Sequence, residues 1–297
     1  MKFLDPTIDV AFKRVFGNQA HPEILISFLN SILDLPEGSK ITSVEITDPY
    51  NQPENIELKL SIVDVRCTDQ QKRQFIIEVQ ASAQKDYPVR SLYYAALAMT
   101  RQLSRGGHYR TIMPVIFVGV LNFKRFESPD YLSTHLILNK ETHEHALEHM
   151  SFTFIELPKF KKTLSQLKTE SDKWIYLLKN AADLDVVPKE LKTTRAIDNA
   201  LDLLNQGTMT TKELDLYDAS IDKRRIEEST LLTAIEKGRE EGREEGREEG
   251  REESEKKAEL AMLGIATELL AAAMPIAKVA AITKLPVAIL KKLKENA

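Results

Sequence analysis

Hydrophobic positions follow two different periods along the first part of the chain. Residues 7–16 and 22–33 repeat apolar side chains every three or four positions, which predicts two amphipathic helices. Three shorter runs follow at 41–47, 58–67 and 73–80, where β-branched residues are frequent and polar clusters mark the ends. These runs predict β-strands, and the short polar turn between the last two predicts a hairpin.

The pattern then returns to a helix at 87–104 and to an almost wholly apolar strand at 111–120, typical of a strand buried on both faces. We expect the apolar side of this helix to carry Leu92, Tyr93, Ala96 and Leu103. Two further strands are predicted near 133–138 and 151–157, and from about residue 161 the pattern is helical. This order predicts an α/β core followed by an α-helical C-terminal extension.

Residues 237–253 repeat the tetrapeptide Gly-Arg-Glu-Glu. Its glycines are Gly238, Gly242, Gly246 and Gly250. Each glycine destabilises a helix by about 1 kcal/mol relative to alanine. The Glu–Arg pairs at i,i+3 stabilise it by only about 0.2–0.5 kcal/mol each. The segment is therefore either a solvated linker helix or a surface for self-association through the glycine stripe.

These patterns divide the chain into four expected parts. Residues 1–160 form the core, 161–236 a helical extension, 237–257 the charged repeat and 258–297 a small helical tail. The tail is rich in lysine, and we expect it either to contact DNA or to pack against other helices or a partner. A homo-oligomer held by the repeat and the tail is one option that this division leaves open.

Composition narrows the class of protein. Of 297 residues, 42% are hydrophobic and 29% are charged, as in ordinary soluble domains. No apolar run approaches the roughly 18 residues of a membrane span, and the single cysteine, Cys67, excludes an internal disulfide framework. We therefore expect a cytoplasmic protein without membrane contact. The net charge is −4, so any affinity for nucleic acid must come from local clusters or from a bound metal.

The predicted hairpin places acidic side chains opposite each other. If its turn centres on Gln71, paired residues have numbers that sum to 142, and Asp64 lies opposite Glu78. Opposed side chains share a face of the sheet, about 4.5–5.5 Å apart at Cβ. Gln80 shares this face because strand side chains alternate, whereas Val79 points the other way, into the core.

Like charges that face each other across a sheet are destabilising unless a cation lies between them or one is protonated. A hard divalent cation such as Mg²⁺ fits, because it takes one or two carboxylates together with phosphate and water. The alternative is an ordinary pair of surface carboxylates on a solvent-facing hairpin.

Several ordered blocks resemble a known family. Asp64 in SIVDVRC followed by FIIEVQ resembles the PD-(D/E)xK nuclease superfamily in its variant that ends in Gln. The blocks DVAFKRVFG, HPEILISFLNSIL, YPVRSLYYAALAMTRQL, MPVIFVGVLNFKRF and FTFIELPKF are similar to the Rpn family of recombination-promoting nucleases and transposases. The resemblance covers nearly the whole chain and implies a restriction-endonuclease-like core with α-β-β-β-α-β order, a mixed sheet flanked by helices.

The resemblance also implies roles for individual residues. Asp64, Glu78 and the Val79 carbonyl would bind Mg²⁺, or Mn²⁺, and Gln80 would occupy the place that lysine usually holds. Glutamine supplies dipoles but no positive charge, so a nearby cation would have to replace lysine. The candidates for that cation are Lys13 and Arg90, and a solvated helix face is the alternative for both.

Arg101, Arg105, His108 and Arg110 surround the Gly106-Gly107 turn and form the densest basic patch of the core, which is either a phosphate contact or ordinary surface charge. Together with Arg90, its three arginines are the expected DNA-binding residues.

We therefore expect a Mg²⁺-dependent DNA endonuclease that hydrolyses phosphodiester bonds, with a role in recombination, mobile DNA or defence against foreign DNA. The competing hypothesis is a catalytically weak or inactive protein that keeps the nuclease fold as a DNA-binding or self-association module. The acidic net charge and Gln80 favour this second hypothesis, and the intact Asp64–Glu78 pair favours the first.

Overall fold

The computed structural model describes residues 2–47, 50–51, 61–62, 64–103 and 106–295. The chain forms two compact units, Met1–Glu228 and Ser229–Ala297. Residues 161–228, expected as part of a helical extension, thus lie in the same unit as the expected core. The division of the chain into four parts stays a prediction.

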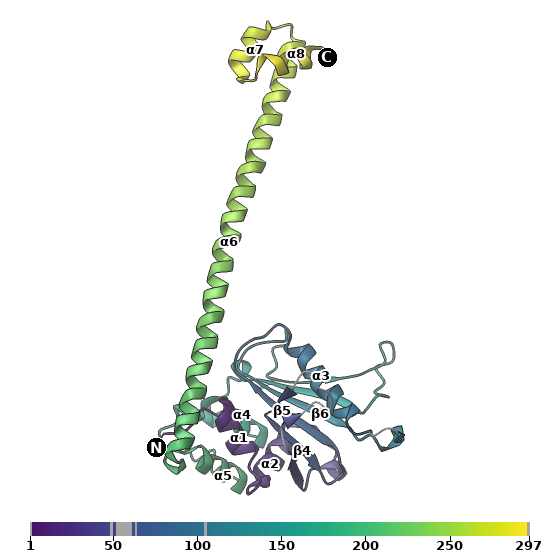
Figure 1. Cartoon of the computed structure of the whole chain (residues 1–297), viewed down its shortest axis with the longest axis vertical. Helices are drawn as coiled ribbons and strands as arrows, with labels where there is room; N and C mark the ends of the chain where they lie inside the picture. Colours follow the sequence, from purple (N-terminus) through teal and green to yellow (C-terminus); the bar gives the residue numbers. More distant parts are fainter. Residues whose placement is uncertain (1, 48–49, 52–60, 63, 104–105, 296–297) are drawn as a thin grey trace. The chain divides into compact units, whose positions relative to one another are not determined.

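A six-stranded mixed sheet forms the centre of the first unit (Figure 1). Its strands, in spatial order, are β1 (Val44–Thr47), β4 (Val65–Asp69), β5 (Gln74–Gln80), β6 (Val115–Leu121), β8 (Met150–Glu156) and β7 (Leu132–Leu136). Neighbours among β5, β6 and β8 are parallel, and the other neighbours are antiparallel. A separate antiparallel pair joins β2 (Tyr50–Asn51) to β3 (Ser61–Ile62). The strand expected at 58–67 lies partly outside the described residues.

Helices cover both faces of the six-stranded sheet (Figure 1). On one face lie α1 (Asp9–Phe16), α2 (Pro22–Ile32), α4 (Glu170–Asn180) and α5 (Arg195–Leu204), and on the other lies α3 (Tyr87–Thr100). Alternate residues of β6 serve the two sides: Ile116 and Val118 pack with the first group, Val115 and Phe117 with α3. Every residue of β6 is buried, which confirms the prediction of a strand covered on both faces.

The prediction of which side of α3 is buried is wrong. Its buried residues are Tyr87, Ser91, Ala95 and Ala98, whereas Leu92 and Tyr93 are 50% and 38% exposed. Small side chains at three of the buried positions let the helix lie close to the sheet, and the bulk on this side comes from the aromatic rings of Phe117 and Phe154. The positions of the larger hydrophobic side chains therefore predicted the wrong face of α3 as buried.

The remainder of the chain is helical, as predicted. Helix α6 (Thr211–Ala271) begins in the first unit and continues into the second, where α7 (Ile276–Thr283) and α8 (Val287–Glu295) follow. A small core of the second unit consists of Ala266, Leu270, Val279 and Leu290. The Gly-Arg-Glu-Glu repeat lies within α6 and is exposed throughout. Its function, as linker or as association surface, stays a prediction.

Short 3-10 helices complete the description: η1 (Glu37–Ser39), η2 (Tyr109–Thr111), η3 (Leu157–Lys159), η4 (Leu164–Gln166), η5 (Ala181–Asp183) and η6 (Gln206–Thr208). None of the described helices combines the length and the apolar character that a bilayer crossing requires.

Candidate functional site

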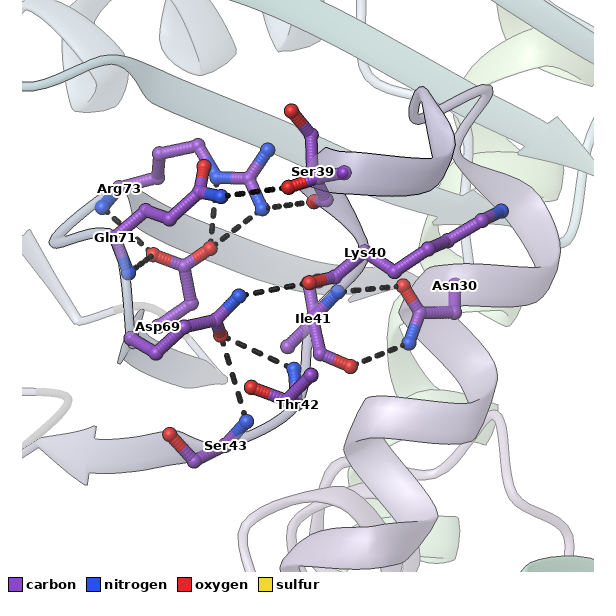
Figure 2. A network of polar contacts seen from close by, with 11 residues as sticks. Asn30, Ser39, Lys40, Ile41, Thr42, Ser43, Asp69, Gln71 and Arg73 are labelled. Atoms are coloured by element: carbon purple, nitrogen blue, oxygen red, sulfur yellow. Dashed lines mark hydrogen bonds and ion pairs between the residues drawn. The ribbon is translucent and has the colours of Figure 1, made fainter.

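A buried ion pair shapes the turn between β4 and β5 (Figure 2). Asp69 and Arg73 are 3% and 8% exposed, and Arg73 Nε donates to Asp69 Oδ2 over 2.7 Å. The other carboxylate oxygen accepts from the backbone N–H groups of Gln71 and Arg73, at 3.0 and 2.9 Å. Arg73 Nη2 also donates to the Ser39 carbonyl over 2.6 Å, and Lys72 takes a left-handed φ of 65°. Removal of either Asp69 or Arg73 would leave the other charge buried and unpaired, so this turn needs both residues.

The register that follows from this turn is the predicted one. Val65 pairs with Ile77 and the ladder continues with the same sum of residue numbers, 142, to Thr68 and Gln74. Asp64 immediately precedes β4, and its Oδ2 accepts a hydrogen bond from the backbone N–H of Val79 over 2.7 Å. Asp64 is therefore held at the edge of the hairpin beside the end of β5.

Glu78 lies inside the protein and not on a solvent-facing hairpin, since it is only 7% exposed. It pairs with Gly119 in the parallel ladder, and a Cβ added to Gly119 would lie 2.7 Å from the hydroxyl of Tyr87. Arg90 Nη2 donates to Glu78 Oε1 over 2.9 Å, whereas Oε2 is buried and finds no hydrogen-bond partner among the described residues. Burial raises the pKa of Glu78 to about 7, although the charge of Arg90 and its hydrogen bond oppose the shift.

Asp64 shares its environment with a second carboxylate, Asp9 at the start of α1. Burial raises the pKa of Asp64 well above its ordinary range, and the hydrogen bond and the charge of Asp9 add to the effect. The pKa of Asp9 is lowered despite burial, because hydrogen bonds with Asp64 and Lys13 stabilise its charged form. Lys13 Nζ lies 2.7 Å from Asp9 Oδ1 and 3.8 Å from Asp64 Oδ1. Burial and the neighbouring Asp9 thus raise the pKa of Asp64, whereas the pKa of Asp9 is lowered beside Lys13.

Arg90 orients the amide of Gln80. The guanidinium donates to Gln80 Oε1 and to Gln84 Oε1, in addition to Glu78. Gln80 Nε2 in turn donates to the carbonyl of Ser82 over 3.2 Å. The structure thus brings both candidate cations to the carboxylates, with Lys13 beside Asp64 and Arg90 beside Glu78.

The basic patch around Gly106 lies elsewhere on the sheet. Arg110 belongs to η2, which precedes the first residue of β6, whereas Glu78 pairs with Gly119, four residues after that first residue. At roughly 3.3 Å per residue this places the start of β6 about 13 Å from Glu78 along the strand. Arg101 directly follows α3, and Arg105 lies outside the described residues. The described part of this patch therefore does not join the carboxylates, and its role in DNA binding stays a prediction.

Two side chains of the site escaped the sequence analysis. Asp9 stands four positions before Lys13, a spacing that places both on one side of a helix, and this signal was available. Tyr87 had no local signal, because its hydroxyl reaches the site only through the packing of α3 on the sheet.

The donor set suits a hard cation with few protein ligands. Within the described ranges, no group of three or more His, Cys, Asp or Glu side chains is arranged to hold a metal ion. Asp64 and Glu78 nevertheless offer carboxylate oxygens, and Oε2 of Glu78 is buried without a partner. An unpaired buried oxygen is costly, and Mg²⁺ takes one or two carboxylates and completes its shell with water and phosphate.

Comparison with known proteins agrees with this geometry. A family model described as PD-(D/E)XK nuclease family transposase matches residues 6–234. The chain belongs to this PD-(D/E)XK nuclease family. No curated protein and no solved structure matches the chain. The mixed six-stranded sheet flanked by helices is the fold expected of a PD-(D/E)XK protein, and membership indicates a nuclease-type role.

Proposed function

We propose that this PD-(D/E)XK family protein is a DNA endonuclease that depends on a divalent cation, Mg²⁺ or Mn²⁺. The observation that supports the proposal most is the buried, unpartnered Oε2 of Glu78, next to Asp64 at the end of the hairpin. Both carboxyl groups have raised pKa values because they are buried, so each has a proton or a cation to gain. A bound cation would supply the partner that the buried Oε2 of Glu78 lacks among the described residues.

In this proposal, Asp64, Glu78 and the Val79 carbonyl hold the cation. When bound, such a cation polarises a phosphoryl oxygen and lowers the pKa of an attacking water. The N–H of Val79 orients the carboxylate of Asp64 through the 2.7 Å hydrogen bond. Lys13 lies beside both Asp9 and Asp64, and its positive charge favours their ionised forms.

Gln80 acts by position and not by proton transfer. Its Oε1 is engaged by Arg90 and its Nε2 by the Ser82 carbonyl, so the amide is fixed in one orientation. The positive charge that a lysine would bring to this place comes in part from Arg90, which also contacts Glu78.

One contact favours the alternative of a catalytically weak DNA-binding or self-association module. The guanidinium of Arg90 already pairs with Glu78 Oε1 at 2.9 Å, and this ion pair competes with a cation for the same carboxylate. Metal titration by calorimetry separates the two functions. A site used for catalysis binds Mg²⁺ or Mn²⁺ in the wild type and loses that binding in Asp64→Asn.

The direct test is nicking of supercoiled plasmid by the full-length protein with Mg²⁺ or Mn²⁺. We expect activity that disappears in EDTA, in Asp64→Ala and in Glu78→Ala, while Glu45→Ala, an exposed carboxylate of β1, keeps it. Nicking that survives both Asp64→Ala and Glu78→Ala contradicts the assignment of the site. A role in recombination, DNA mobility or defence, in the cytoplasm, is the biological context that we propose for this activity.

A further inference from the structure

A pocket of about 200 Å³ is lined by Asp9 and by Val79 and Gln80, which follow Glu78 in the chain, and it lies between three separate segments of the first unit. Asp9 lines it from the start of α1 and Gln80 from the end of β5. The third wall is the first part of α6, which contributes Lys223, Arg224 and Glu227. Residues 220–227 of α6 thus form one wall of a pocket next to the candidate site.

This part of α6 is tied to the N-terminal segment by polar contacts. Arg224 Nη1 donates to Asp5 Oδ2 over 3.1 Å and to Thr7 Oγ1 over 3.0 Å. The buried Tyr217 accepts a hydrogen bond at its hydroxyl from the Asp5 backbone N–H over 2.8 Å. These contacts hold Lys223 at the pocket, because it is the residue immediately before Arg224 on the same helix.

The cations around the site differ in whether their charge is already balanced. Lys13 pairs with Asp9, Arg90 with Glu78, and Arg224 with Asp5 and Glu228. Lys223 is exposed and makes no hydrogen bond or ion pair within the described part of the chain. Its charge nevertheless reaches the site, where it contributes to the lowered pKa of Asp9. Lys223 therefore offers a positive charge at the pocket, near Asp9 and Glu227, that forms no ion pair with any described residue.

We propose that Lys223 binds a DNA phosphate in this pocket and supplies, from α6, the positive charge that Gln80 does not. A lysine ammonium is a compact charge on a flexible stem, so it can meet a phosphate oxygen without a fixed fork geometry. This assignment rests on the proposed function, since a phosphate enters the pocket as part of the DNA substrate. It also gives α6 a part in substrate binding.

The test measures binding of a short fluorescein-labelled DNA duplex to the full-length protein by anisotropy, in EDTA, so that cleavage does not interfere. Each phosphate contact contributes about 0.9 to the slope of log K against log salt. We expect Lys223→Ala to lower this slope by about 0.9. The wild type then loses about 3.5-fold more affinity than Lys223→Ala between roughly 50 and 200 mM salt. Lys223→Arg is expected to keep the wild-type slope.

Lys212→Ala is the matched control, because Lys212 is also an exposed lysine of α6 but does not line the pocket. It should leave the slope unchanged, and circular dichroism should show all three variants folded. A wild-type slope in Lys223→Ala, or an equal decrease in Lys212→Ala, overturns the assignment of Lys223. Wild-type protein without measurable DNA binding also overturns it.

A nicking assay distinguishes this inference from the proposed function. If both hold, Lys223→Ala slows nicking at least about ten-fold and Lys223→Arg restores most of the rate. A wild type that binds DNA with the expected slope change but does not nick contradicts the endonuclease proposal alone. Nicking that is equal in Lys223→Ala and wild type contradicts the role of Lys223 at the site.

Discussion

The buried Glu78 makes the free energy of unfolding of the metal-free protein depend on pH, and the substitution Glu78→Gln removes this dependence. The pKa of Glu78 rises from an ordinary value of 4.5 to about 7 in the folded protein, because burial penalises the charged form. The unfolded chain therefore releases this proton near pH 4.5, whereas the folded protein keeps it until about pH 7. Stability that is fully present below pH 4.5 is lost as the pH rises through 7.

The size of the effect follows from the shift. One pKa unit corresponds to 1.36 kcal/mol, so the whole window amounts to about 3 kcal/mol, of which about 2.5 kcal/mol falls between pH 5 and pH 8. Glu78→Gln removes the titrating group but keeps the shape. We therefore expect the free energy of unfolding of Glu78→Gln, relative to wild type, to rise by about 2.5 kcal/mol from pH 5 to pH 8.

Urea denaturation of both proteins in EDTA at the two pH values measures this difference. Glu45→Gln, at an exposed position of β1, serves as the control and should differ from wild type by the same amount at both pH values. Adding Mg²⁺ at pH 8 to ten times its dissociation constant should stabilise the wild type by about 1.4 kcal/mol and Glu78→Gln by less. A Glu78→Gln difference that changes by under about 1 kcal/mol between pH 5 and pH 8 refutes the reasoning.

Three further predictions concern the supports of the site, and urea denaturation measures each. Gly119→Ala should destabilise the protein by about 1–3 kcal/mol, because the new methyl group meets the Tyr87 hydroxyl; equal stability contradicts the close approach. Asp69→Ala should cost about 3–5 kcal/mol, because Arg73 stays buried without its partner, and Asp69→Leu with Arg73→Met should lose less. Lys72→Gly should stabilise by about 1 kcal/mol, because glycine tolerates the positive φ; a destabilised variant contradicts this reading of the turn.

Local patterns in the sequence were sufficient for most of the architecture. Helices and strands follow from periodicity, since a helix returns its side chains to one face every 3.6 residues and a strand every two. The register of the hairpin followed from its turn, because pairing is antiparallel and a shift of one residue would send Ile77 and Cys67 away from the core that they share. The opposition of Asp64 and Glu78 could therefore be predicted before any three-dimensional information.

Long-range packing decided the remaining features. The buried face of α3 depended on which small residues allow close approach to the aromatic rings of β6 and β8. The sequence analysis grouped the arginines near Gly106 with Arg90 as DNA-binding residues, yet parallel pairing of β5 with β6 places Arg110 at the other end of the strand from Glu78.

The sequence by itself determined the elements, their order and the facing carboxylates, because each depends on patterns within one helix, one strand or one hairpin. Only the tertiary structure decided the chemistry of these carboxylates. Burial raises the pKa of Glu78, and burial together with the neighbouring Asp9 of α1 raises the pKa of Asp64. Helix α6 brings Lys223 to the pocket that Gln80 also lines, although Lys223 lies 143 positions further along the chain. These pKa shifts and contacts depend on distances between residues far apart in the chain, and the pattern of residues along the sequence does not contain those distances.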